Sequence, residues 1–250
     1  MAPAPNRSPM MKPAESPVLD LTALSPLVRW KRALQALGRV LANPEETDQV
    51  LVFSTYANAA SMTDRMARFF DDPDGMRLYT EHRTIDSKTI DLDALLALPD
   101  DTLGHAYATF LRSRGLTPEV FDNPPEGVTD PRASYVIQRM RQTHDLWHVV
   151  TGHETDPAGE IALQAFTFAQ AGAPSSAILA TMGTLRTAHE RPDIARPLLR
   201  DVVGAYRRGR RATKLAVFPW ETHWTTPLVE VRALLGLPTT PAPRAVPLAA

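Results

Sequence analysis

Hydrophobic positions along the chain recur mostly at the three- and four-residue spacing of an amphipathic helix. The first example is a stripe of apolar residues near the start: Leu27, Trp30, Leu34, Leu37 and Leu41. Residues at this spacing share one helix face. Asn43 and Pro44 should end this helix, and Pro44 with the two glutamates after it can open another. We expect the two helices to pack as a hairpin.

The same spacing returns after Asp100 and Asp101 in a further apolar stripe: Leu103, Ala106, Tyr107, Phe110 and Leu111. Gly115 lies where this helix would stop. Residues 72–98 give a mixed signal with a short helix at 93–98, and residues 120–130 are predicted to be loop because they contain Pro124, Pro125 and Gly127.

The second half of the chain is helical by the same criterion. We predict helices at about residues 132–150, 157–170, 174–189, 197–208 and 227–235. Asp156 is suited to cap the second of these, with Pro157 at its first position, and Gly236 to stop the last. Alternation typical of strands is nearly absent. The predicted fold class is therefore all-α.

Proline marks the ends of the folded unit. The chain has 23 prolines, many of them near its two ends. We expect residues 1–18 and 238–250 to be disordered, proline-rich tails. Residues 19–237 contain no linker-like segment and no internal repeat, so we predict one multi-helix domain.

Charge and cysteine content limit the classes of partner and of metal ligand that this protein can have. Lys and Arg total 27 against 28 Asp and Glu, so no overall charge attracts nucleic acid, and we expect no nucleic-acid partner. The chain has no cysteine, which leaves histidine and carboxylates as the strong candidate metal ligands. No apolar run is long enough for a signal peptide or a membrane span. From the sequence we expect a cytoplasmic protein.

His144 and His148 lie four residues apart, so both imidazoles project from one helix face. Asp145 adjoins them. Glu160 falls in the first turn of the following helix, where a hairpin would bring its carboxylate to the same site. Two nitrogens with one or two oxygens suit a first-row ion such as Zn²⁺, Fe²⁺, Mn²⁺ or Co²⁺.

A histidine pair at this spacing can also be an ordinary surface or core feature. Ile137 and Met140 lie beside the same face, which indicates a buried site where unpaired polar groups are costly. Four other residues show no such arrangement and are interpreted as solvated or capping: His153, Glu154, His189 and His223.

Arg141 stands three residues before His144 and four before Asp145. Its planar guanidinium could hold a substrate carboxylate through two parallel hydrogen bonds. A structural ion pair with Asp145 is the alternative, and the sequence leaves both open.

At this point the residues resemble a known family. The stretch from Tyr135 to His148, followed by eleven residues and Glu160, resembles the His-Asp-x-x-His-x11-Glu pattern of the Coq4 ubiquinone-biosynthesis proteins. The segments 98–110 and 209–237 are similar to other parts of that family. The resemblance covers about residues 27–237.

The resemblance implies that His144, Asp145, His148 and Glu160 bind a divalent metal ion. Zinc is most often assigned to the family, with iron, cobalt or manganese as alternatives. It also implies an apolar groove for a prenyl tail, peripheral attachment to a membrane surface, and other ubiquinone-biosynthesis enzymes as partners. The implied reaction is metal-dependent C1-decarboxylation, in an oxidative or non-oxidative form, of a prenylated hydroxybenzoate, with Arg141 as the catalytic residue. A homodimer is left open.

The chain also departs from the family pattern. Gln164 and Thr167 stand where relatives commonly have a Lys and a Glu, so the substrate or the reaction can differ.

Two other functions stay open. One is a non-catalytic lipid-binding scaffold that organises ubiquinone-biosynthesis enzymes. The other is an HD-type phosphohydrolase, whose additional ligands would come from four candidates: His82, His105, Asp193 and Asp201.

A basic segment is the predicted membrane contact. It contains five cations, Arg207, Arg208, Arg210, Arg211 and Lys214, followed by Trp220 and Trp224. Cations favour a helix C-terminus, but cations beside tryptophan are also typical of a lipid interface.

Overall fold

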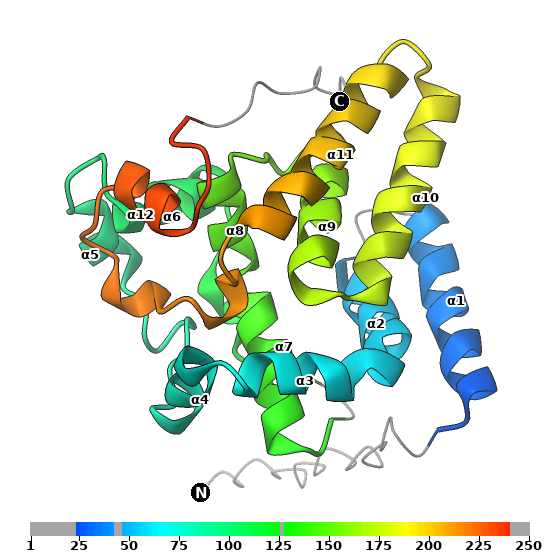
Figure 1. Cartoon of the computed structure of the whole chain (residues 1–250), viewed down its shortest axis with the longest axis horizontal. Helices are drawn as coiled ribbons and strands as arrows, with labels where there is room; N and C mark the ends of the chain where they lie inside the picture. Colours follow the sequence, from blue (N-terminus) through cyan, green and yellow to red (C-terminus); the bar gives the residue numbers. More distant parts are fainter. Residues whose placement is uncertain (1–23, 43–46, 126–127, 241–250) are drawn as a thin grey trace, which may run out of the picture.

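The helices predicted from apolar spacing are present in the computed structural model, which describes residues 24–42, 47–125 and 128–240. These ranges hold α1 Pro26–Ala42, α2 Thr47–Asn58, α3 Met62–Phe70, α4 Pro73–Thr80, α5 Leu92–Leu96, α6 Leu103–Ser113, α7 Pro131–Gln142, α8 His144–Thr151, α9 Pro157–Ala171, α10 Pro174–Glu190, α11 Ala195–Arg211 and α12 Leu228–Leu234 (Figure 1). They contain no β-strand, only an isolated bridge between Thr102 and Pro227. The prediction of an all-α fold is confirmed.

Helix α9 lies between α10 and α11 and packs closely against both (Figure 1). The approach of α11 depends on Gly209. A β-carbon there would lie 2.8 Å from the β-carbon of Ala169 and 2.8 Å from the carbonyl oxygen of Phe166. Because neither contact is tolerable, a larger residue would push α11 away from α9.

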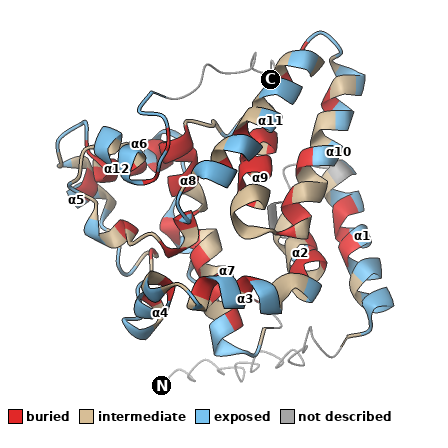
Figure 2. Cartoon of the chain, viewed as in Figure 1, coloured by how far each residue is buried: buried red, intermediate tan, exposed pale blue. Residues whose placement is uncertain are grey.

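The main hydrophobic core lies where α6, α8, α9 and α12 meet (Figure 2). Its largest side chains include Leu111, Trp147, Phe166 and Trp220, all with 1% of their surface exposed or less. Full burial of such a side chain contributes on the order of 2 kcal/mol. This core holds α8 and α9, the two helices of the predicted metal site, in a fixed relation.

Helices α1 and α2 form the predicted hairpin, which packs on α10. The contact is made by Ala33, Ala36 and Leu37 of α1 with Phe53 and Ala57 of α2. Most of the sequence-derived stripe lies to one side of this contact and is exposed. The side chain of Leu41 and the predicted break at Asn43 and Pro44 lie outside the described residues.

Several helix boundaries differ from the prediction. Helix α3 was not predicted, and the mixed region 72–98 contains α4 as well as the short α5. Asp72 caps α4 with its carboxylate, and Pro73 occupies the first helical position. Such local capping signals, not apolar spacing, identify this helix.

The helix predicted over residues 132–150 is interrupted for one residue at Thr143. The Thr143 hydroxyl donates to the carbonyl of Arg139 at 2.8 Å, and the Thr143 N–H donates to the same carbonyl at 3.0 Å. The N–H of Trp147 in turn donates to the Thr143 carbonyl at 3.1 Å. The helical hydrogen bonding therefore continues through the interruption, so α7 and α8 follow each other as one nearly continuous helix.

Of the two C-terminal tryptophans, Trp220 is too deeply buried to reach a lipid interface, so its predicted interfacial role is wrong. Trp220 is fully buried, and its indole N–H donates to the carbonyl of Leu215 at 3.1 Å. Trp224 stacks on Tyr107 with ring centroids 5.6 Å apart and packs on the core. Both indoles stabilise the fold of the C-terminal segment.

Other sequence predictions concern the chain ends and the membrane. Residues 1–18 and 241–250, the greater part of the predicted tails, lie outside the described residues. Within the described part of the chain, no helix combines the length and the apolar character needed to cross a bilayer.

Candidate metal centre

The site is built on the hairpin of α8 and α9. Helix α8 ends at Gly152, which adopts φ 74° and donates its N–H to the carbonyl of His148 at 2.8 Å. Helix α9 begins after Asp156, whose carboxylate accepts from the N–H of Gly159 at 2.7 Å. Trp147 and Phe166 contact edge to face with centroids 6.1 Å apart. The short turn and this aromatic contact bring Glu160 beside the two histidines.

Three ligand atoms converge. The Nε2 atoms of His144 and His148 are 3.3 Å apart, and the Glu160 carboxylate lies 3.1 Å from His148 Nε2 and 3.8 Å from His144 Nε2. All three ligand atoms lie within 4.8 Å of one another. The prediction, made from their spacing, that His144, His148 and Glu160 lie close together is confirmed.

The ring of His148 is held on both sides. Its Nδ1 donates to the backbone carbonyl of His153 at 2.8 Å, so the lone pair is on Nε2, which faces the cluster. Phe110 of α6 stacks on the imidazole with centroids 5.5 Å apart. The guanidinium of Arg114 lies over the Phe110 ring, with its central carbon 4.0 Å from the ring centroid. His148 therefore reaches the cluster with a fixed tautomer and orientation.

The electrostatics match the geometry. Burial opposes a charge on His148, but the hydrogen bond and charge of Glu160, with the His153 carbonyl, raise its pKa. Burial likewise opposes a charge on Glu160, yet its contact with His148 and the charges of the histidines lower its pKa. Burial and the neighbouring His148 lower the pKa of His144. The negatively charged carboxylate of Glu160 thus faces two imidazoles, and the imidazole of His144 is held neutral.

The donor set fits a first-row divalent ion. Two imidazole nitrogens and a carboxylate oxygen are the ligands that Zn²⁺ and Fe²⁺ commonly take, and three protein ligands leave positions open for a substrate. The orientation of His148 by a backbone carbonyl is the usual outer support of a metal-binding imidazole.

Asp145 is placed at the edge of the cluster and is not one of the three converging ligands. Burial raises the pKa of its carboxyl group, while the charges of His144 and His148 act in the opposite direction. Burial, and to a smaller extent the charge of Asp145, raise the pKa of Tyr107 on α6.

Arg141 lies one turn before His144, and its Nη2 donates to the hydroxyl of Thr55 at 3.4 Å. No salt bridge joins it to Asp145, so the structure does not support the alternative of a structural ion pair. Burial lowers the pKa of its guanidinium. The Thr55 hydroxyl is neutral, so the charge of this guanidinium is not balanced by that contact.

The interpretation of His153 and Glu154 as solvated or capping residues is wrong. Besides the bond from its carbonyl, the His153 ring lies 3.3 Å from Nη2 of Arg208 on α11. Burial and the charge of Arg208 lower the pKa of His153 to about 4. Glu154 forms an ion pair with Arg114. Both residues lie in the short turn between α8 and α9, which carry the candidate ligands. The shortness of this turn was the sequence feature that could have predicted such contacts.

The departures from the family pattern also lie on α9. Gln164 is half-buried, and Thr167 is buried with a hydroxyl that has no hydrogen-bond partner. No charged group therefore occupies these two positions on the Glu160 face of the helix.

The additional ligands of an HD-type site do not assemble. His105 points its Nδ1 at the carbonyls of Leu96 and Leu98, and Asp193 pairs with Arg191. Neither these two residues nor His82 and Asp201 join the His144 cluster, the one potential metal-binding group found in the described residues.

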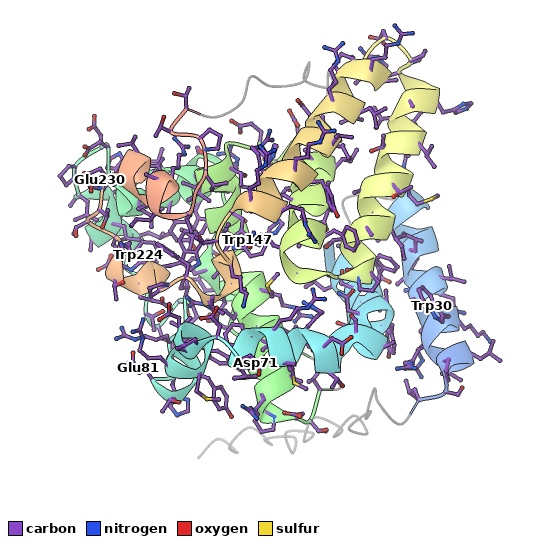
Figure 3. The ribbon with its side chains drawn as sticks, in the orientation of Figure 1. Trp30, Asp71, Glu81, Trp147, Trp224 and Glu230 are labelled. Atoms are coloured by element: carbon purple, nitrogen blue, oxygen red, sulfur yellow. The ribbon has the colours of Figure 1, made fainter. Side chains whose placement is uncertain are left out.

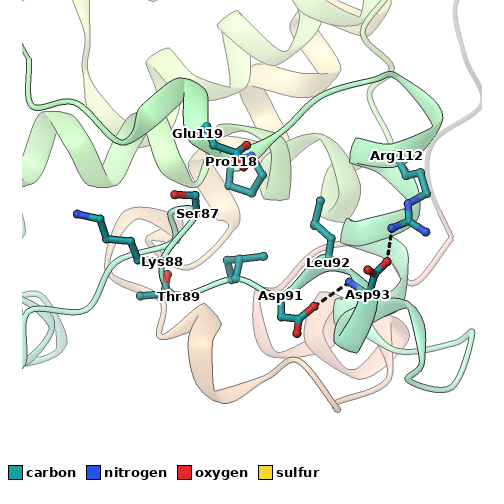
Figure 4. A pocket seen from close by; sticks show the side chains of 10 residues that line it. Ser87, Lys88, Thr89, Asp91, Leu92, Asp93, Arg112, Pro118 and Glu119 are labelled. Atoms are coloured by element: carbon teal, nitrogen blue, oxygen red, sulfur yellow. Dashed lines mark hydrogen bonds and ion pairs between the residues drawn. The ribbon is translucent and has the colours of Figure 1, made fainter. Parts of the chain in front are cut away.

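A separate groove lies at the C-terminal end of α6, with a volume of about 560 Å³ (Figure 4). Lys88 and Glu119 line it, and Arg112 pairs with Asp93 at 2.5 Å on one wall. It contains none of the predicted site residues. Its polar, charge-paired lining is unlike the apolar groove that the resemblance implies for a prenyl chain.

Comparison with known proteins identifies relatives along most of the chain. Residues 21–241 match the family model described as coenzyme Q (ubiquinone) biosynthesis protein Coq4. The mitochondrial ubiquinone biosynthesis protein COQ4 homologue of Rattus norvegicus is 30% identical over 223 residues, which is 89% of this chain and 83% of the rat protein. That of Danio rerio is 32% identical, covering 84% and 78% of the two chains.

A solved structure has the same fold. It is the crystal structure of a Nostoc punctiforme protein provisionally assigned to ubiquinone biosynthesis, with 29% sequence identity and a TM-score of 0.68. The match covers 82% of this chain and 97% of the other.

Proposed function

Because the chain belongs to the Coq4 family and its role lies in ubiquinone biosynthesis, we propose that it removes the C1 carboxylate of a prenylated hydroxybenzoate with the help of a bound divalent metal ion. The observation that carries this proposal is the convergence of His144, His148 and Glu160 within 4.8 Å, with Arg141 one turn away. A potential metal centre, with an arginine one helical turn away whose bonded partner is the neutral hydroxyl of Thr55, suits an aromatic acid, which presents a carboxylate and a phenolic oxygen.

The proposed reaction breaks the bond between the ring and the carboxylate carbon. The electron pair stays on the ring, carbon dioxide leaves, and a proton takes its place. A bound metal ion supplies Lewis acidity that stabilises this negative charge. An oxidative form would also need an electron acceptor such as dioxygen.

The side chains of the protein provide the positioning. Arg141 binds the carboxylate through its guanidinium fork, and burial strengthens this interaction because little water competes for it. His148, Glu160 and His144 hold the ion, and the His153 carbonyl with Phe110 fixes the angle of the His148 ring. Thr167 leaves an unpaired hydroxyl on α9 that is suited to a polar substituent of the substrate.

The direct test is turnover by the purified full chain, reconstituted separately with Zn²⁺, Fe²⁺, Co²⁺ or Mn²⁺. The substrate is a prenylated 4-hydroxybenzoate labelled with ¹³C in its carboxylate, and labelled carbon dioxide is measured. Glu160→Gln should lower turnover by more than the roughly 10–100-fold typical of losing an outer partner of a metal site.

Arg141→Gln should lower kcat/KM by about 10–100-fold, as expected for loss of hydrogen bonds to a charged group, with a near-parental melting temperature. Arg207→Gln, which removes an exposed arginine, is the matched control and should have parental turnover. Stoichiometric metal without labelled carbon dioxide from any reconstituted form would refute catalysis and support the scaffold alternative. The prenyl groove, the enzyme partners and the homodimer remain predictions.

A further inference from the structure

Helix α1 carries exposed apolar side chains that have no partner in the described fold. Leu27 is 81% exposed, Trp30 46% and Leu34 60%. Positions 27, 30 and 34 fall on one stripe of the helix, beside the face that packs on α2. Figure 3 shows Trp30 on α1 at the outer margin of the molecule. A clustered apolar stripe of this kind marks an interaction surface.

The charges on α1 are all positive. Its 17 residues include Arg29, Lys31, Arg32 and Arg39 and no Asp or Glu. Arg32 donates to the Tyr56 hydroxyl at 2.7 Å and Arg39 to Gln49 at 3.4 Å, both on the α2 side. Lys31 is exposed beside the apolar stripe. Helix α1 thus combines an apolar stripe with charged residues that are all cations, which makes it complementary to a surface that is apolar inside and negative outside.

We propose that α1 is the surface by which this protein docks on an anionic lipid bilayer, with Leu27, Trp30 and Leu34 at headgroup depth and Lys31 at the phosphates. A helix with this distribution lies in the plane of a membrane interface, where tryptophan is favoured. A second copy of the chain would bring four cations against four like charges. Of the two tryptophans that the sequence suggested beside the basic end of α11, Trp220 is fully buried and Trp224 is partly buried against the core.

Helix α10 carries further exposed apolar side chains. Ile178 of α10 packs on the α1–α2 cluster, and Met182 and Leu185 follow it on the same helix face with 39% and 60% exposure. The inference rests on the proposed function in one respect: docking on a membrane would give the protein access to a prenylated substrate. Docking itself requires neither the metal nor turnover, so the two proposals can fail separately.

Tryptophan fluorescence provides a nearly site-specific probe of whether α1 contacts the lipid. Of the four in the chain, Trp147 and Trp220 are 1% and 0% exposed and Trp224 is half-buried, so the emission change on binding should come chiefly from Trp30. We expect the full chain to float with vesicles of phosphatidylcholine and phosphatidylglycerol. Its emission should shift to the blue and be quenched by brominated acyl chains. Trp30→Phe should remove most of this response.

Variants separate the competing surfaces. Leu27→Ser, Trp30→Ser and Leu34→Ser together should weaken vesicle binding by more than about tenfold, since three apolar contacts are lost. All three positions are exposed, so metal content and melting temperature should stay parental. Lys31→Gln should reduce the dependence on anionic lipid. Leu199→Ser with Val203→Ser, on an exposed stripe of α11, is the matched control.

Three outcomes would overturn the proposal. Flotation that is unchanged in the triple variant excludes α1, and a loss confined to the α11 variant moves the contact there. A parent dimer that becomes monomeric in the triple variant, with vesicle binding unchanged, assigns the stripe to a second copy. Flotation by α1 in a protein that releases no labelled carbon dioxide leaves the docking intact and removes only the proposed reaction.

Discussion

At the scale of single residues, His153 connects the candidate metal centre to α11. Its carbonyl orients the His148 ring, and its own imidazole lies against Arg208. The folded state resists protonation of this ring, because a second buried cation beside Arg208 would be unfavourable. This makes His153 a source of pH-dependent stability that can be tested in metal-free protein.

The pKa of His153 falls from 6.5 to about 4 on folding. Below pH 6.5 the unfolded chain takes up a proton that the folded chain does not, so the free energy of unfolding should decrease as pH falls toward 4. The expected loss from this residue is on the order of 2 kcal/mol. Denaturant unfolding of chelator-treated protein across this range measures it.

His153→Gln should flatten the pH dependence in that window, since glutamine does not titrate, and should keep the backbone bond to His148. His189→Gln, at an exposed position on α10, is the control and should behave like the parent. Identical pH profiles for His153→Gln and the parent would show that His153 is not the source.

At the scale of secondary structure, the site depends on the close turn between α8 and α9. A β-carbon on Gly159 would lie 2.1 Å from the carbonyl oxygen of Glu154 and 2.8 Å from its backbone nitrogen. Because these are backbone atoms, the turn would have to move. The same turn carries the His153 carbonyl, so its movement would misalign His148.

Gly159→Ala should therefore lower stability by about 1–3 kcal/mol, the usual cost of overpacking, and weaken metal binding. Gly38→Ala in α1 is the matched substitution: nothing lies within 4 Å of its added β-carbon. In a helix interior it should raise stability by roughly 0.5–1 kcal/mol. Melting curves with and without metal measure both effects. Parental metal affinity in Gly159→Ala would contradict the role of the turn.

At the scale of the whole molecule, metal ligation by His144, His148 and Glu160 would join α8 to α9, and α9 in turn packs on α10 and α11. An ion that binds only this assembled arrangement stabilises the folded state by mass action. At a hundredfold excess over its dissociation constant the gain is about 2.7 kcal/mol.

Removal of metal by a chelator should therefore lower the melting temperature, and its return should restore it. The double variant His144→Ala with His148→Ala should contain no stoichiometric metal and show no such response. His189→Ala should respond like the parent. Equal metal content in the double variant and the parent, measured by elemental analysis, would remove the site assignment.

The sequence alone determined the elements and the ligand pattern, because helix formation and capping depend on neighbours a few residues apart. The four-residue spacing of His144 and His148, and Asp156 with Pro157 ahead of Glu160, were sufficient to place three ligands together. Apolar spacing missed α3 and α4, since short helices leave too few periods to detect.

Tertiary structure decided which faces are covered. The sequence treated the α1 stripe as an ordinary helix face and Trp220 as exposed, whereas packing buries Trp220 and leaves Leu27 and Trp30 outside. Burial of a side chain depends on distant segments, and so does the partner of Arg141, the hydroxyl of Thr55 on α2. His153 depends on Arg208, 55 residues later, for the same reason: local sequence does not encode which helices meet.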